Sequence, residues 1–199
     1  MLSRSYQLIA PVYDLAVARA LEGPRRRSLA KLPREGRQDI LIDGIGTGLD
    51  LPHLPPGPRY IGTDLVAAML RPARARARGL DCELLRADSM KLPFAAASFD
   101  WVVLHLIVAV VPDPVAALAE AARVVRPGGY LLVLDKFLRR GQIAPLRRLL
   151  NPFVSRLATR LDVVFEDTLA QVPNLRVISD EPALASGWFR NILLQRTVD

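Results

Sequence analysis

The chain has 199 residues, enough for one domain with a continuous core and too few for a large second domain. Hydrophobic residues make up 51% of it, yet the longest apolar run, Trp101 to Val111, contains His105 and falls well short of the roughly 20 residues of a membrane-spanning helix. A single cysteine excludes an internal disulfide, and two histidines with one cysteine give no metal-binding pattern. The net charge of +7 is compatible with binding to anionic lipid, nucleic acid or an acidic substrate, but it does not distinguish among them.

The first segment, residues 1–35, has apolar side chains at helical spacing, and Pro11 is expected to kink or divide the helix. We expect this segment to form a helical cap on the fold. The N-terminus shows no apolar stretch followed by a small-residue cleavage site, so we expect a cytoplasmic protein.

Strand-like runs then alternate with helical patterns, which indicates βαβ units and a parallel sheet. A helix is expected between each pair of strands, most clearly over 114–125, where Asp113 can cap it, Pro114 suits its first turn and Gly128 follows its end. The pattern predicts a Rossmann-like, doubly wound α/β fold in a single domain, residues 1–199, with a mostly parallel sheet of seven strands near 39–43, 59–63, 82–86, 99–105, 129–135, 174–179 and 189–196.

The strand predicted at 39–43 runs into a glycine-rich turn that contains Gly44, Gly46 and Gly48. Glycine permits unusual backbone angles there and lets the main chain approach a ligand closely. A dinucleotide site with the pattern G-x-G-x-x-G would need a glycine at Leu49, so the spacing G-x-G-x-G favours another nucleoside ligand.

Two acids follow the next two strands at their carboxyl ends, where ligands of open α/β sheets bind. Asp64 can accept both hydroxyl protons of a ribose, and it can also cap the helix that follows. Asp88 can accept a hydrogen bond from an adenine amino group while Ser89 and Met90 pack on the ring. Taken alone, an aspartate before a turn is ordinary.

Taken in order, these stretches resemble the class I S-adenosylmethionine-dependent methyltransferases over roughly residues 39–135. Ser98 to Asp100, which opens the fourth strand, and Arg126 to Tyr130, which opens the fifth, complete the match. The resemblance implies S-adenosylmethionine as cofactor and S-adenosylhomocysteine as product, bound by Asp43, Gly44, Gly46, Gly48, Asp64, Asp88, Ser89, Met90 and Leu104.

One position departs from the pattern of that family. An acidic residue usually stands two places before the first glycine, where this chain has Ile42, and the acid here is Asp43. The contact to the methionine ammonium group therefore lacks its usual residue.

Three further stretches narrow the resemblance. Tyr6 to Asp14, Gly48 to His53 and Leu104 to Pro114 are similar to the bacterial phosphatidylethanolamine N-methyltransferases, and the first is also similar to the quinone-biosynthesis C-methyltransferases. The resemblance implies methyl transfer to an amine, with the phosphatidylethanolamine head group or its methylated derivatives as acceptor. It also implies that the N-terminal tyrosines close over the cofactor and the acceptor.

Three residues are candidates for catalysis. Tyr6 and Tyr13 can orient a neutral amine by hydrogen bonds or stabilise its developing cation against a ring face. Their alternative role is to pack an amphipathic helix on the core. His105, at the end of the fourth strand, can take the proton that an amine must lose, or it can be a buried histidine with satisfied hydrogen bonds.

The connection over residues 137–172 is far longer than an ordinary link between strands, and we expect this insertion to shape the substrate pocket. Its arginines can offer forked donors to a lipid phosphate, while the apolar residues between them lie at the inner face of a membrane as a reversible contact. The alternative is a lid helix with a charged outer face. The arginines are Arg139, Arg140, Arg147 and Arg148.

Other acceptors stay open, namely carbon, sulfur or nitrogen atoms of a quinone precursor or of a soluble metabolite. Nucleic acid is disfavoured, because the Asn/Asp-Pro-Pro-Tyr/Phe tetrad of amino-methylating enzymes is missing and Asn151 to Phe153 lacks the second proline. A protein that binds S-adenosylmethionine without transferring the methyl group is a further alternative. The sequence names no oligomeric state.

Overall fold

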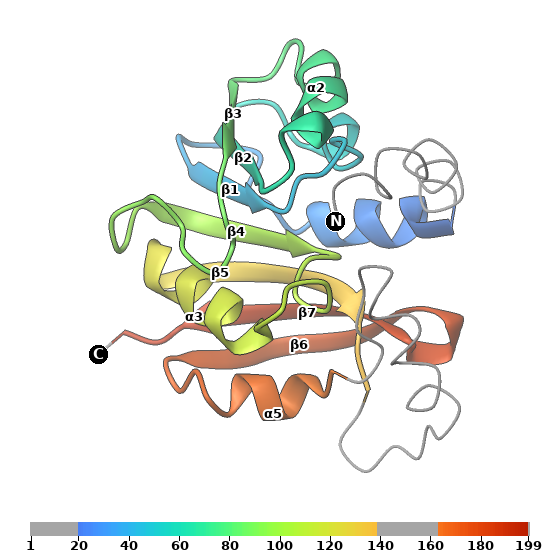
Figure 1. Ribbon diagram of the computed structural model, residues 1–199, viewed down its shortest axis with the longest axis vertical. Helices are drawn as coiled ribbons and strands as arrows, with labels where there is room; N and C mark the ends of the chain where they lie inside the picture. Colours follow the sequence, from blue (N-terminus) through green and yellow to red (C-terminus); the bar gives the residue numbers. More distant parts are fainter. Residues whose placement is uncertain (1–19, 139–162, 199) are drawn as a thin grey trace.

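The structure is a computed structural model, described over residues 20–138 and 163–198 (Figure 1). Its centre is one seven-stranded sheet with the strand order β3-β2-β1-β4-β5-β7-β6. Neighbouring strands pair in parallel, except that β7 runs antiparallel to both β5 and β6. The predicted Rossmann-like fold with seven strands is confirmed. The strands are β1 (Asp39–Asp43), β2 (Arg59–Asp64), β3 (Cys82–Arg86), β4 (Phe99–His105), β5 (Val125–Lys136), β6 (Leu175–Leu184) and β7 (Phe189–Arg196).

Both faces of the sheet are covered, because the central strands are apolar on both sides. Leu41 and Leu104 belong to a core cluster shared with α3 (Pro114–Val124) and α5 (Phe165–Leu169). Ile42, on the opposite face, belongs to a second cluster shared with α2 (Ala67–Arg76) and with a helix over residues 20–29. The sheet is therefore the middle layer of three, as Figure 1 shows.

Helix α3 begins where the sequence predicts. Oδ1 of Asp113 accepts hydrogen bonds from the backbone N–H groups of Val115 and Ala116, at 3.0 and 3.1 Å. The helix ends at Val124, where the chain turns to extended backbone.

The prediction of a helix in every connection was wrong in three places, of which the link between β6 and β7 is described below. Between β1 and β2 the chain forms only a short 3-10 helix, η1 (Leu51–His53), because prolines at 52, 55, 56 and 58 interrupt the segment. Between β3 and β4 the described chain turns without a helix.

Two strands are longer than predicted. Strand β5 begins at Val125 instead of residue 129, because Val125 pairs with Phe99. The proline-glycine run lies in an irregular stretch of β5 between this pair and the pair of Trp101 with Tyr130. Strand β6 ends at Leu184 instead of residue 179, because it pairs with β7 as far as Phe189. A second short 3-10 helix, η3 (Ala185–Gly187), links the two.

The helix over residues 20–29, here called the cap helix, packs across the sheet on the same face as α2. Its polar anchors reach the antiparallel half of the sheet: Asn191 donates to the carbonyl of Pro24 at 3.2 Å, and Arg27 donates to the carbonyl of Ala183 at 2.9 Å. This is the described part of the predicted cap. Across the described residues, no helix combines the length and apolar character needed to cross a membrane.

Candidate cofactor and active site

The carboxyl ends of β1, β2, β3 and β4 lie along one edge of the sheet, and the glycine turn follows β1 there. A Cβ added at Gly48 would lie 2.7 Å from Leu51 Cδ1 and 3.0 Å from Ala73 Cα, so this glycine is required by packing. A Cβ added at Gly46 would meet no atom within 4 Å, although its φ of +56° is also left-handed. A Cβ added at Gly44 would lie 2.8 Å from Ile107 Cβ, so the turn is packed at both ends and open at Gly46.

Asp64, the last residue of β2, faces that open turn. Its Oδ2 accepts from the backbone N–H of Gly46 at 2.9 Å, and its Oδ1 accepts from the N–H of Val66 at 2.8 Å. Burial raises the pKa of the half-buried carboxyl group, and the two N–H groups oppose that rise. Each carboxylate oxygen keeps a further lone pair, so the group can also accept two ribose hydroxyls.

Asp43, the last residue of β1, is buried and accepts from two hydroxyls, Thr63 Oγ1 and Ser89 Oγ, both at 2.8 Å. Its Oδ2 has no hydrogen-bond partner among the described residues. Burial raises the pKa of Asp43 to about 6 against the lowering effect of the two hydroxyls. Asp43 therefore ties β1 to β2 and to the segment after β3.

Asp43 does not occupy the place of the displaced family acid. Ile42 packs in the cluster beneath the cap helix and α2, whereas Asp43 points to the opposite face, as successive strand residues do. The position from which the usual acid would project is filled by an apolar side chain.

The segment after β3 is shaped by Asp88, whose Oδ1 accepts from the N–H of Met90 at 2.9 Å. Ser89 is buried with its hydroxyl on Asp43, so its side chain supports the turn from inside. Asp88 and Met90 are half-buried. That this turn holds an adenine ring stays a prediction. The Ser89 hydroxyl is bonded to Asp43.

Leu104 is fully buried in the core cluster beneath α3. A side chain without exposed surface cannot touch a ligand as the chain is arranged here. Its predicted part in cofactor binding would therefore fall to the backbone at the end of β4.

His105, at the end of β4, has both ring nitrogens engaged. Nδ1 lies 2.9 Å from Oδ1 of Asp50, and Nε2 lies 2.9 Å from Oγ of Ser28 on the cap helix. Arg25, also on the cap helix, donates to the same Asp50 oxygen at 2.6 Å. The imidazole is only 4% exposed.

Sequence reasoning missed the two partners of His105, Asp50 and Ser28, and the Arg25 that bonds to Asp50. Asp50 carries a signal, because an acid flanked by Leu49 and Leu51 directly after a glycine turn is expected to need a buried partner. Arg25 and Ser28 carry none, since only the docking of the cap helix brings them to His105.

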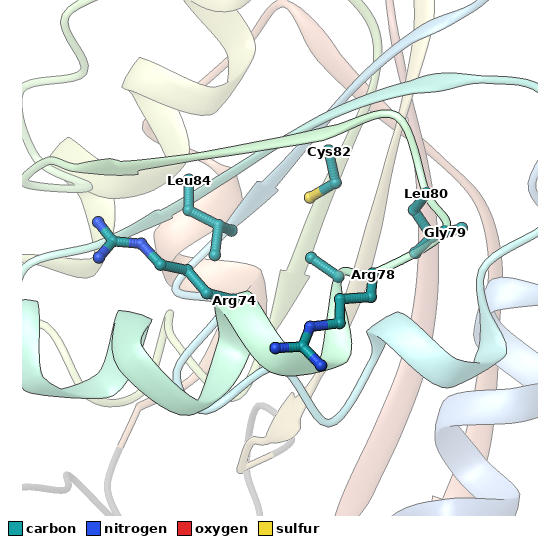
Figure 2. Close-up of a pocket in the computed structure, with 7 residues that line it drawn as sticks. Arg74, Arg78, Gly79, Leu80, Cys82 and Leu84 are labelled. Atoms are coloured by element: carbon teal, nitrogen blue, oxygen red, sulfur yellow. The ribbon is translucent and has the colours of Figure 1, made fainter.

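A hollow of about 330 Å³ lies away from this edge (Figure 2). It is formed where α2 ends and β3 begins, at the amino edge of the parallel strands. Two arginines border an apolar floor in it, and it is not the cofactor site. The lining residues are Arg74, Ala77, Arg78, Gly79, Leu80, Cys82 and Leu84.

Six predicted site residues lie outside the described part of the chain. They are Tyr6, Tyr13, Arg139, Arg140, Arg147 and Arg148.

Comparison with known proteins matches residues 41–133 to a family model described as a methyltransferase domain. A phosphatidylethanolamine N-methyltransferase from Cereibacter sphaeroides is 34% identical over 199 residues, covering 98% of this chain and 97% of that protein. A demethylmenaquinone methyltransferase from Thermus thermophilus is 38% identical over 136 residues, covering 64% of this chain and 62% of that protein.

Solved structures agree on the fold. The methyltransferase in complex with the Trm112 methyltransferase activator of Haloferax volcanii has a TM-score of 0.80 at 19% identity, with 100% of both chains covered. An S-adenosylmethionine-dependent methyltransferase from Thermotoga maritima has a TM-score of 0.70 at 19% identity, also with 100% of both chains covered.

The residues at the carboxyl edge fit S-adenosylmethionine. The open space at Gly46 admits a ligand against the main chain, and Asp64 stands beside it with free lone pairs for a ribose. Together with a relative that matches nearly the whole chain, these features identify the protein as a member of the class I S-adenosylmethionine-dependent methyltransferases.

Proposed function

We propose that the protein transfers methyl groups from S-adenosylmethionine to the amino head group of phosphatidylethanolamine or of its methylated derivatives. The observation that carries this proposal is the extent of the match. The family model ends at residue 133, whereas the match to the phosphatidylethanolamine N-methyltransferase covers 98% of the chain. The segments outside 41–133 are those left to select the acceptor, because the cofactor half is shared with methyltransferases for other acceptors.

Methylation of an amine needs a neutral nitrogen in line with the bond that breaks, and the nitrogen must lose a proton. When bound, S-adenosylmethionine supplies the methyl group as an electrophile on a sulfonium. In a neutral imidazole that donates from Nδ1 to Asp50, Nε2 of His105 is the proton acceptor. We propose His105 as the general base, and the structure adds a condition: Nε2 must exchange Ser28 for the acceptor.

The remaining predicted residues complete the proposal. Tyr6 and Tyr13 would orient the amine, and the arginines at 139, 140, 147 and 148 would hold the lipid phosphate. Reversible contact with an anionic membrane surface follows from the same segments. Sedimentation with phosphatidylglycerol vesicles tests the contact: binding that weakens as salt is raised supports it, and no binding at low salt contradicts it.

The second candidate is methylation of a quinone precursor or of a soluble metabolite on carbon, sulfur or nitrogen. The demethylmenaquinone methyltransferase relative favours it, at 38% identity over 64% of the chain. A competition assay separates the two, with phosphatidylethanolamine and demethylmenaquinone in the same vesicles and labelled S-adenosylmethionine. The proposal expects label in the phospholipid; label in the quinone alone would replace it with the second candidate.

A further inference from the structure

Four buried side chains form a continuous chain of polar contacts between the cap helix and the cofactor edge. Ser28 contacts His105, His105 contacts Asp50, and Asp50 contacts Arg25, at 2.9, 2.9 and 2.6 Å. The chain thus leaves the cap helix at Ser28 and returns to it at Arg25.

Asp50 sits where this chain can act on the cofactor turn. It follows Gly48 by two residues, and its carbonyl accepts from the N–H of His53 to form η1. The N–H of Leu51 in turn bonds to the carbonyl of Gly48, the glycine at which an added Cβ would lie 2.7 Å from Leu51 and 3.0 Å from Ala73 Cα. A displacement of Asp50 is therefore passed to the glycine turn through the backbone.

The charges make the arrangement sensitive to any missing member. Burial alone would raise the pKa of Asp50, but its interactions with His105 and with the Arg25 guanidinium hold that pKa well below its ordinary value. Asp50 is thus a buried carboxylate that depends on its partners, and Arg25 is a buried cation whose Nε has no partner among the described residues. Undocking of the cap helix would remove the Arg25 guanidinium from the buried Asp50 carboxylate.

The order Ser28, His105, Asp50 is also that of a hydrolytic triad. Ser28 is only 1% exposed, however, and it lies between the cap helix and the sheet, so no substrate carbonyl reaches it while the cap helix is docked. The contacts serve the fold of the site instead of a second reaction.

We infer that Asp50 and Arg25 are positioning residues that couple docking of the cap helix to binding of S-adenosylmethionine at the glycine turn. Cofactor binding orders the turn, the ordered turn fixes Asp50, and Asp50 holds the cap helix through Arg25. Because such coupling is reciprocal, loosening the cap helix weakens cofactor binding by the same factor. The inference rests on the cofactor site and is independent of the acceptor.

Arg25→Gln tests this most sharply, because Arg25 lies on the cap helix and not in the cofactor turn. Arg26→Gln is the matched control: it removes the same charge from the next, exposed position. Calorimetry gives the Kd for S-adenosylmethionine, and hydrogen–deuterium exchange of amides 20–29 reports cap docking. Both are measured below the melting transition of each variant.

In the unmodified protein, S-adenosylmethionine should slow exchange in the cap helix. Arg25→Gln should raise the Kd by about 10-fold, within the usual range of coupling, and abolish that slowing, while Arg26→Gln should change neither. Equal Kd values and equal amide-exchange rates in the two variants would overturn the inference. It would also be overturned if S-adenosylmethionine did not change amide exchange in the cap helix of the unmodified protein. If Arg25→Gln does not fold, Ser28→Ala should raise the Kd by a smaller factor with folding retained; an unchanged Kd there would also overturn it.

Discussion

Nδ1 of His105 lies 2.9 Å from Oδ1 of Asp50, so the end of β4 is tied to the segment that follows the cofactor turn. His105→Asn keeps a donor toward Asp50 but removes the group that can take a proton. If His105 is the general base, kcat for the amine acceptor should fall by about 100-fold or more, well beyond any rise in the Kd for S-adenosylmethionine. Steady-state kinetics and calorimetry measure the two quantities. A kcat close to that of the unmodified protein would leave His105 with the positioning role only.

Alanine variants at Gly46 and Gly48 should differ in how strongly they affect cofactor binding and stability. Gly46→Ala places a methyl group in open space, so it should cost about 1–2 kcal/mol of stability for the left-handed backbone and strongly weaken cofactor binding. Gly48→Ala drives a Cβ against Leu51 and Ala73, so overpacking should add a further 1–3 kcal/mol or so. Urea unfolding and calorimetry check both variants. A Gly46→Ala protein with normal cofactor affinity would place the ligand elsewhere.

Asp43 should make stability depend on pH in a defined direction. Burial raises its pKa from the ordinary 3.8 to about 6, so the folded protein binds this proton more tightly than the unfolded chain does. Its contribution is most favourable below the lower value, declines as pH rises, and is fully unfavourable above the higher one.

Asp43→Asn keeps an acceptor for Ser89 and Thr63 and removes the ionisation. At a pH of about 8 the variant should be more stable than the unmodified protein by up to roughly 3 kcal/mol, and at about pH 4 the advantage should vanish. Urea unfolding at a series of pH values measures the difference. A constant difference across that range would contradict the assigned environment of Asp43.

Asp64→Ala should weaken S-adenosylmethionine binding by about 10-fold or more, because it removes the ribose acceptor and frees the N–H groups of Gly46 and Val66. Asp113→Ala is the control: it removes the cap of α3 and about 1 kcal/mol of stability, and its carboxylate bonds to N–H groups of that helix instead of the glycine turn. Calorimetry gives both Kd values. Identical values would remove Asp64 from the cofactor site.

The sheet and the cofactor turn could be predicted because their signals are local. Apolar runs mark the buried strands, and the glycine spacing and Asp64 follow the strand ends directly. The extension of β6 to Leu184 could not be predicted, because Asp180, Glu181 and Pro182 are typical of the end of a strand. The strand continues through them because they pair with β7.

The buried chain around His105 was beyond the sequence for a different reason. Arg25 and His105 are far apart along the chain, and neither residue carries a spacing that names the other. Asp43 shows the same limit: the sequence gives its place beside Gly44 but not the hydroxyls of Thr63 and Ser89 from which its carboxylate accepts.

The most direct test is transfer of labelled methyl groups from S-adenosylmethionine by the purified protein into a lipid extract and, in parallel, into a soluble-metabolite extract. The account predicts label in methylated derivatives of phosphatidylethanolamine. Label confined to the soluble fraction would contradict the proposed acceptor.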